Sequence, residues 1–206
     1  MNEIDKLTEY FTKFPGIGQR QAKRFVYFLL TRNSSFLKEF TDLILSLKKS
    51  TKICSSCFRF YSANSNNSHL CNLCLDKNRD SSILMVVAKD ADLNNIERIG
   101  DYNGSYFVLG GLLPILEKNP EERIRIKPLI NLIKEKAEAG VLKEVILALS
   151  LNPEGENTTD YILRSLKPLA EEYKIKIATL GRGLSTGTEL EYLDDDTFEN
   201  AFKNRS

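Results

Sequence analysis

The sequence has no tryptophan, a single histidine and only two methionines among its 206 residues. It lacks any apolar run close to the roughly 20 residues of a membrane-spanning helix. Its start, MNEIDKLTEYF, lacks the charged-then-apolar pattern of a secretion signal. Neither a phosphate-binding P-loop nor a glycine-rich dinucleotide fingerprint occurs. These absences argue against a membrane protein, a secreted protein and an ATP-driven motor, and they predict a cytoplasmic location.

The composition is that of a globular protein, with 42% hydrophobic and 28% charged residues. The length exceeds that of one typical domain, and the composition changes along the chain. We therefore expect a small N-terminal unit followed by a larger domain.

The net charge of +1 conceals an uneven distribution of charge. Residues 1–60 hold eleven Lys or Arg against five acids, a balance of +6, whereas residues 184–206 hold six acids against two basic residues, a balance of −4. A basic front suits a polyanion such as nucleic acid, and an acidic rear suits a protein or another subunit. Two solvated surfaces would explain the same charges.

Hydrophobic periodicity predicts an α/β protein with a helical N-terminal region. Residues 2–50 carry apolar residues at helical spacing and predict three helices. Beyond Asp80, strand-like runs alternate with amphipathic stretches, which indicates a parallel sheet with crossover helices. The expected strands are Ile83–Ala88, Tyr106–Leu109, Val145–Leu149 and Ile175–Leu180, and the expected helices lie around 92–99, 124–139 and 157–172.

A glycine-containing hairpin, FPGIG, separates the first two predicted helices. Glycine permits a tight turn and close backbone approach, and the amides that open the next helix can hold a phosphate oxygen. Cations follow in the opening turns of that helix, so the segment predicts sequence-tolerant DNA contact, although a plain helical hairpin would look similar. The candidate DNA-binding residues are Gly16, Ile17, Gly18, Arg20, Lys23 and Arg24.

Four cysteines form two CxxC pairs, Cys54/Cys57 and Cys71/Cys74, separated by thirteen residues. Two such knuckles supply the four thiolates of a tetrahedral structural zinc site. Two disulfides, or inert thiols, are the alternatives, and His69 is a less favoured replacement ligand. Because no ligand position is left open, we expect one structural zinc per chain.

These features occur in an order that resembles the RecR family of recombination mediators over nearly the whole chain. The matching segments are FPGIGQRQAKRF, the two cysteine pairs, NRDSSILMVV, FVLGG, SLNPEGENTTDYI and GRGLSTGTELEYLDDDTF. The resemblance implies four parts: a helix-hairpin-helix region over 1–52, a zinc finger over 53–78, a Toprim-like domain over 79–181 and a C-terminal oligomerisation segment over 182–206.

The resemblance also implies partners. A homo-oligomer, dimer or tetrameric ring, would grip gapped DNA or a junction of single and double strands, associated with the nucleoid. It would act with RecO, and with RecF, to load RecA at single-stranded gaps. The chain departs from the family pattern in a longer insert between the cysteine pairs and in LLPILEKNPEERI, which replaces a glycine- and serine-bearing loop.

The Toprim resemblance raises the question of catalysis. Catalytic members place a glutamate after the first strand and an acidic pair after the third, which together hold magnesium. Here the first position is Ala88, and Asp90 and Asp92 lie too far along to replace it simply. Glu154 and Glu156 occupy the third-strand position. We expect no enzyme activity and interpret this pair as a partner-docking patch, with weak magnesium binding or simple helix-dipole acids as alternatives.

Two other functions are alternatives to a mediator. A Toprim-type nuclease or nicking enzyme would cleave gapped DNA in a magnesium-dependent reaction. A zinc-ribbon RNA or transcription accessory would prefer single-stranded RNA, but the chain shows no aromatic stacking motif of that kind.

Overall fold

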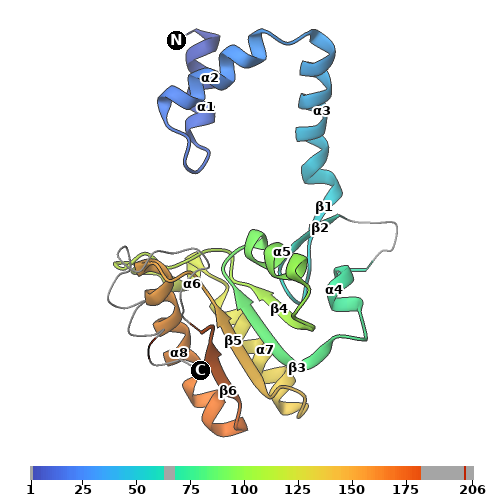
Figure 1. Ribbon diagram of the computed structural model, residues 1–206, viewed down its shortest axis with the longest axis vertical. Helices are drawn as coiled ribbons and strands as arrows, with labels where there is room; N and C mark the ends of the chain where they lie inside the picture. Colours follow the sequence, from blue (N-terminus) through green and yellow to red (C-terminus); the bar gives the residue numbers. More distant parts are fainter. Residues whose placement is uncertain (1, 63–67, 182–201, 203–206) are drawn as a thin grey trace. The chain divides into compact units, whose positions relative to one another are not determined.

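The computed structural model describes residues 2–62, 68–181 and 202, and it divides the chain into two compact units, Met1–Lys52 and Ile53–Ser206. The expected C-terminal oligomerisation segment, 182–206, lies outside the described residues except for Phe202. Each unit is considered by itself below (Figure 1).

The N-terminal unit consists of the three expected helices: α1 (Glu3–Thr12), α2 (Gln19–Leu30) and α3 (Ser34–Ser50). Side-chain oxygens of Asn2 and Asn33 accept backbone hydrogen bonds at the starts of α1 and α3, as good N-caps do. Helices α1 and α2 meet through the rings of Phe11 and Phe25, whose centroids lie 5.5 Å apart. Few residues of this unit are buried: Thr8, Ala22 and Val26.

The cysteine-containing region opens the second unit and holds elements that the periodicity did not predict. Strands β1 (Thr51–Ile53) and β2 (Phe60–Ser62) form a two-stranded sheet, and α4 (Asn72–Leu75) is a single helical turn that begins after Cys71. Three-residue strands and a one-turn helix leave no measurable period in a sequence. The contacts that hold these short elements in place are described below.

The rest of the second unit is a parallel four-stranded sheet with the order β4-β3-β5-β6. All four expected strands are present within a few residues of their predicted bounds, which confirms the α/β fold class. The strands are β3 (Asp80–Val87), β4 (Gly104–Val108), β5 (Glu144–Ala148) and β6 (Lys176–Thr179); the connecting helices are α5 (Asp90–Ile99), α6 (Pro120–Arg123), α7 (Ile126–Glu138) and α8 (Pro153–Tyr173).

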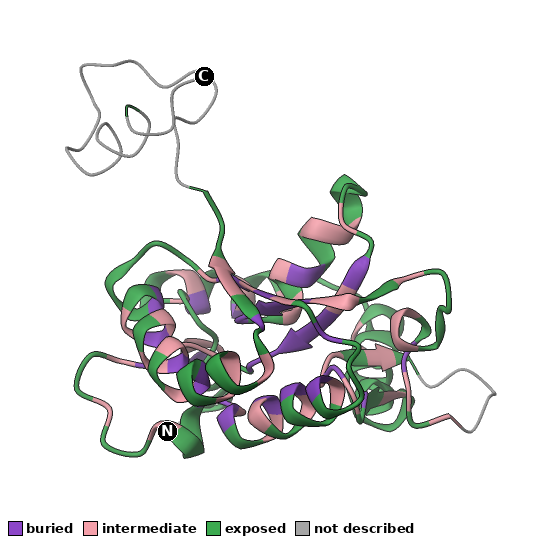
Figure 2. Ribbon diagram, turned by 90° about the horizontal axis from the view of Figure 1, so that it is seen from below, coloured by how far each residue is buried: buried purple, intermediate pink, exposed green. Residues whose placement is uncertain are grey.

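Two apolar cores cover the two faces of this sheet. Leu84, Val86 and Phe107 face one core, together with buried residues of α7 and α8. Met85 and Val87 face the other core, together with Leu93 of α5. The alternation follows from the period of two in a strand. Figure 2 shows the buried residues concentrated on the sheet and on the helix faces turned toward it.

Among the described residues, no helix combines the length and apolar character needed to cross a lipid bilayer.

Candidate metal centre and nucleic-acid interface

The four cysteines converge on one point. Their Sγ atoms all lie within 4.8 Å of one another, with 3.7 Å between Cys54 and Cys74 and 3.6 Å between Cys57 and Cys71. A zinc ion bonded to four sulfurs at about 2.3 Å would hold those sulfurs about 3.8 Å apart. The observed spacing therefore fits a tetrathiolate metal site.

Of the alternatives that the sequence left open for these cysteines, the structure shows neither disulfides nor His69 as a ligand. None of the four forms a disulfide, and His69 is exposed and outside the cluster. Hydrogen bonds within the cluster, first that between Cys54 and Cys57, lower the pKa of Cys54 and raise the pKa of Cys57. A metal ion binds the deprotonated thiolates, so its binding to this cluster would release protons.

The first knuckle is joined to the α/β sheet through its backbone and one aromatic ring. The amide of Val108 donates a 2.8 Å hydrogen bond to the carbonyl of Cys57, so the knuckle pairs with the outer edge of β4. The next residue, Phe58, has φ +62° and packs its ring 5.3 Å from that of Phe107. Sequence reasoning missed Phe58, because nothing local marks a residue that inserts into a distant core.

The hairpin of the N-terminal unit has the backbone geometry that its glycines suggest. Gly16 has φ +76°, a region that side chains with a Cβ disfavour. Gly18 is the N-cap of α2 with φ −84°, and a Cβ there would meet nothing within 4 Å. No neighbouring atom therefore requires a glycine at this position, which is open toward solvent. Between them, Ile17 is half-buried and donates its amide to the Phe14 carbonyl.

The three candidate cations, Arg20, Lys23 and Arg24, are exposed on the first turns of α2. Arg24 makes a 3.3 Å hydrogen bond with Gln21, and within the described part of the chain none of the three forms an ion pair with a carboxylate. The hairpin and the cations lie within a few residues of one another. This arrangement supplies amide donors and positive charge on one exposed helix end.

The first-strand position of the Toprim-like domain carries no ligand for a metal. Ala88 follows β3 and is buried. The two nearby acids are used elsewhere: Asp90 Oδ1 accepts the amide of Phe60 at 2.7 Å, and Asp92 Oδ2 accepts the amide of Lys89 at 2.9 Å. Asp90 thus ties α5 to the cysteine region, and Asp92 closes the first turn of α5.

The acidic pair lies in a setting that differs from the sequence expectation. Helix α8 begins at Pro153 rather than near Asn157, because the Asn152 side chain caps it by accepting the Gly155 amide. Glu154 and Glu156 are therefore exposed residues within the first helical turn. Side chains two apart on a helix point to different faces, which does not favour one ion shared by this pair.

A different acid, Asp160, lies on the same helix face as Glu156. Residues four apart on a helix are neighbours. Both line a cavity of about 210 Å³ at the carboxyl ends of β5 and β6. Sequence reasoning missed Asp160, although the i, i+4 spacing was available once the helix start was placed at Pro153. Among the described residues, the only cluster of three or more metal-ligating side chains is the group of four cysteines.

The segment after β4, where the chain departs from the family pattern, is held by α8. The Leu113 amide donates to the Thr158 hydroxyl at 2.8 Å, and the Asn157 side chain donates to the carbonyls of Leu113 and Pro114. Beyond this anchor, Ile115 and Leu116 are exposed. The loop thus presents two apolar side chains near the start of α8.

A helical hairpin, a four-cysteine cluster that could hold a metal ion and a parallel α/β sheet together define the architecture of this class of protein. Two family models match the chain: "RecR, helix-hairpin-helix" over residues 4–47 and "Toprim domain" over residues 82–180.

Curated relatives match over almost the whole length. A "Recombination protein RecR" from Ligilactobacillus salivarius is 37% identical over 98% of this chain and 96% of its own. Proteins with the same name from Lactobacillus johnsonii and Chloroherpeton thalassium are each 34% identical over the same shares. The chain belongs to the RecR family of recombination proteins.

Proposed function

We propose that this protein is a non-catalytic recombination mediator that holds gapped or junction DNA and, with RecO and RecF, helps to load RecA in cytoplasmic, nucleoid-associated repair. The main support for this proposal is the similarity to recombination proteins over nearly the full length, combined with the exposed hairpin and cations at the start of α2. Membership of the family supports the role in recombination, and the partners are the finer part of the proposal.

DNA contact would take place at the hairpin. The first amides of an α-helix have no intrahelical acceptor, and Gly18 leaves those of α2 without a covering side chain. Arg20 and Arg24, one turn apart, with Lys23 beside them, would neutralise neighbouring phosphates. Such contacts go to the backbone of DNA and carry no base information, so binding is expected to tolerate any sequence.

A salt titration tests this interface. The double variant Arg20→Ala/Arg24→Ala should weaken binding to gapped duplexes of different sequence equally and lower the slope of log K against log[salt] by about 2. The matched control is Lys48→Ala/Lys49→Ala, which removes the same charge from exposed positions at the end of α3. An unchanged slope in the first variant, or an equal fall in the control, would remove the hairpin from the interface.

Zinc is the metal that we propose for the cysteine cluster. Four thiolates in a tetrahedral arrangement favour zinc, and a closed four-sulfur site holds the fold rather than performing chemistry. Metal analysis of the purified protein, before and after chelation, tests the assignment. A folded, metal-free protein with four reactive thiols would refute it.

We propose that the protein has no catalytic activity because of the residues that follow β3 in the Toprim-like domain. Ala88 provides no ligand, and Asp90 and Asp92 are engaged with backbone amides. Incubation with nicked and gapped DNA and magnesium, followed by denaturation of the product, distinguishes the two functions. Intact DNA supports the mediator, whereas magnesium-dependent cleavage makes the protein a nuclease and assigns a role to Glu156 and Asp160.

Partner docking is proposed at the start of α8. Glu154 and Glu156 are exposed there, next to the apolar tip formed by Ile115 and Leu116. Charge reversal, Glu154→Lys/Glu156→Lys, should weaken association with RecO, measured by light scattering or titration calorimetry. Glu171→Lys/Glu172→Lys, at the far end of the same helix, is the matched control. Equal binding by both variants would leave helix-dipole acids as the explanation of the pair.

Self-association is proposed for the N-terminal unit. A groove of about 640 Å³ there is lined mostly by apolar side chains of α1, α2 and α3, among them Leu7, Phe11, Phe40 and Ile44. A surface of this kind is typical of an interface between protein chains. A second copy of the chain, in a dimer or a tetrameric ring, is the occupant that the family resemblance implies.

A further inference from the structure

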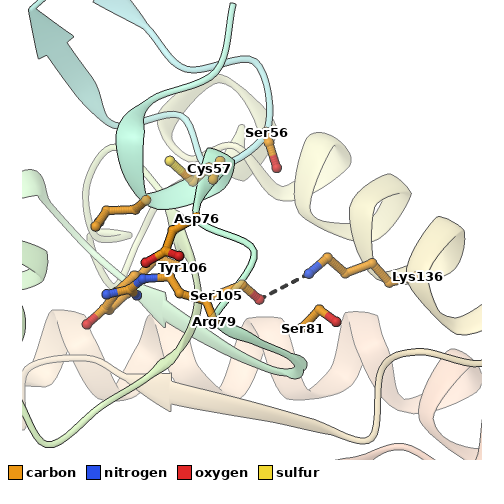
Figure 3. Close-up of a pocket in the computed structure, with 10 residues that line it drawn as sticks. Ser56, Cys57, Asp76, Arg79, Ser81, Ser105, Tyr106 and Lys136 are labelled. Atoms are coloured by element: carbon orange, nitrogen blue, oxygen red, sulfur yellow. Dashed lines mark hydrogen bonds between the residues drawn. The ribbon is translucent and has the colours of Figure 1, made fainter.

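A second cavity, of about 200 Å³, lies beside the cysteine cluster near the amino ends of β3 and β4. Cys57, Cys74, Ser105 and Lys136 are among the residues that line it, and Figure 3 shows Lys136 reaching toward Ser105 from helix α7. The walls thus come from both knuckles, from the sheet and from helix α7. No motif in the sequence brings α7 together with the cysteines.

Lys136 is placed on α7 three residues after the buried Ile133, so its stem lies along the covered side of the helix. Figure 3 shows the side chain reaching into the cavity, where its Nζ donates a 3.0 Å hydrogen bond to Ser105 Oγ. Within the described part of the chain it has no carboxylate partner within 4.0 Å. Burial lowers the pKa of this lysine.

The other cation of the cavity is already neutralised. The Arg79 guanidinium contacts both carboxylate oxygens of Glu97 at 2.6 Å and the Gly104 carbonyl at 2.7 Å. Bidentate pairs of this kind hold the arginine in place. Asp76 also lines the cavity but forms no ion pair with Lys136, so Lys136 is the cation here without a carboxylate within 4.0 Å among the described residues.

The cysteine cluster supplies the missing negative charge. Four thiolates around one divalent zinc leave a net charge of −2 in a largely buried site. A half-buried ammonium in the cavity that Cys57 and Cys74 line would offset part of that charge without binding the metal. A free anion in the same cavity would instead face the thiolates of Cys57 and Cys74, which disfavours it.

We propose that Lys136 is the outer cation of the tetrathiolate site: positioned by Ser105, it compensates the thiolate charge and binds the zinc-holding knuckles to α7. The inference rests on the zinc proposed above. Groups that surround a metal site without binding the metal commonly change its affinity 10- to 100-fold, through charge and hydrogen bonding. Lys136 thereby makes metal retention depend on the folded α/β domain.

The test compares zinc retention in matched variants of the full-length protein. Lys136→Met keeps the length of the side chain and removes its charge, and we expect about tenfold weaker zinc affinity in a chelator competition. Lys136→Arg should retain most of the affinity. Lys134→Met, two residues away on the exposed face and paired only with Glu138 at 3.8 Å, is the control and should match the wild type. Far-UV circular dichroism of each zinc-loaded variant checks that α7 is intact.

A second variant keeps the proposal testable if Lys136→Met does not fold. Ser105→Ala removes the acceptor that positions the ammonium, and it should weaken zinc retention by a few fold in the same direction. The charge-transfer bands of the cobalt-substituted protein, which arise from the thiolates, should shift in Lys136→Met and remain unchanged in Lys134→Met.

The outcomes separate this inference from the metal assignment. A wild-type protein without zinc refutes the metal itself. Zinc-loaded wild type with unaltered affinity in both Lys136→Met and Ser105→Ala refutes the role of Lys136 alone. Thermal stabilisation by inorganic sulfate that disappears in Lys136→Met would show an anion site in the cavity and would also overturn the proposal.

Discussion

The two units of this protein differ in how far their apolar side chains are buried. In the second unit, Phe107, Leu84 and Leu129 are fully buried between a sheet and its helices. In the N-terminal unit, α3 runs for 17 residues without one buried residue, and Phe40 and Ile44 remain exposed. The same chain therefore contains a self-sufficient core and a helical unit whose apolar side chains lack cover.

This difference indicates where each unit obtains its stability. The α/β unit obtains it from its own core, together with the cysteine cluster that covers the outer edge of β4. Exposed apolar groups gain free energy only when something covers them, at about 25 cal/mol per Å². The N-terminal unit is thus expected to gain stability on association. Substitutions in this unit should therefore weaken oligomer assembly more than they lower the free energy of unfolding.

Loss of the metal should give the largest effect and should fall on the second unit. Cys57→Ser removes one thiolate, and with it much of the roughly 10 kcal/mol or more that structural zinc contributes. We expect zinc to be lost and the melting temperature of the α/β unit to fall by more than about 10 °C, measured by metal analysis and calorimetry. Ser55→Ala, on an exposed neighbouring residue, should retain both. Normal stability of a zinc-free Cys57→Ser protein would contradict the comparison.

Removal of one phenylalanine from each unit tests the comparison directly. Phe107→Ala empties part of a closed core and should cost about 3–5 kcal/mol in denaturant unfolding. Phe40→Ala removes a ring that is 40% exposed, and we expect at most about 1 kcal/mol in the isolated chain. Its effect should instead appear as weaker self-association in analytical ultracentrifugation. If Phe40→Ala unfolds the chain and leaves the oligomer intact, the two units do not differ in the way described.

Gly155 provides a sharper test of packing inside the second unit. Its missing Cβ allows the start of α8 to lie against the Ser150 carbonyl, and a methyl group there would overlap that oxygen. Gly155→Ala should therefore shift the helix start and cost about 1–3 kcal/mol. Glu154→Ala, on the exposed neighbour, should change stability little. Equal unfolding midpoints for the two variants would show that the helix start adapts freely.

Regular spacing in the sequence allowed much of this structure to be predicted. Apolar residues at helical spacing located α1, α2 and α3, and four β-prone runs located the parallel sheet. The doubled CxxC spacing predicted the cluster of cysteines, because each knuckle positions its own pair locally. All of these patterns involve residues that are close together in the chain, and a single sequence reveals such local patterns most directly.

One of the features that were missed is local, and the others depend on contacts between distant residues. The start of α8 was placed near Asn157 because apolar periodicity begins late, although Asn152 followed by Pro153 is a capping signal. The contact of Phe58 with Phe107 and the cavity shared by Lys136 and Cys74 involve segments about 50 or more residues apart. No local spacing distinguishes such residues from ordinary half-buried ones.

The smallest expected effects concern the two glycines of the hairpin, and they separate folding from binding within the N-terminal unit. Gly16→Ala places a Cβ on a residue with φ +76° and should cost about 1–2 kcal/mol in denaturant unfolding. Gly18→Ala meets no neighbour and should cost less than about 1 kcal/mol, as alanine is only a poorer N-cap. Its methyl group would occupy the open space through which we propose that a phosphate approaches the start of α2, and we expect DNA binding to weaken several-fold. Unaltered DNA affinity in Gly18→Ala would mean that phosphates are held by the side chains of Arg20 and Arg24 without the helix amides.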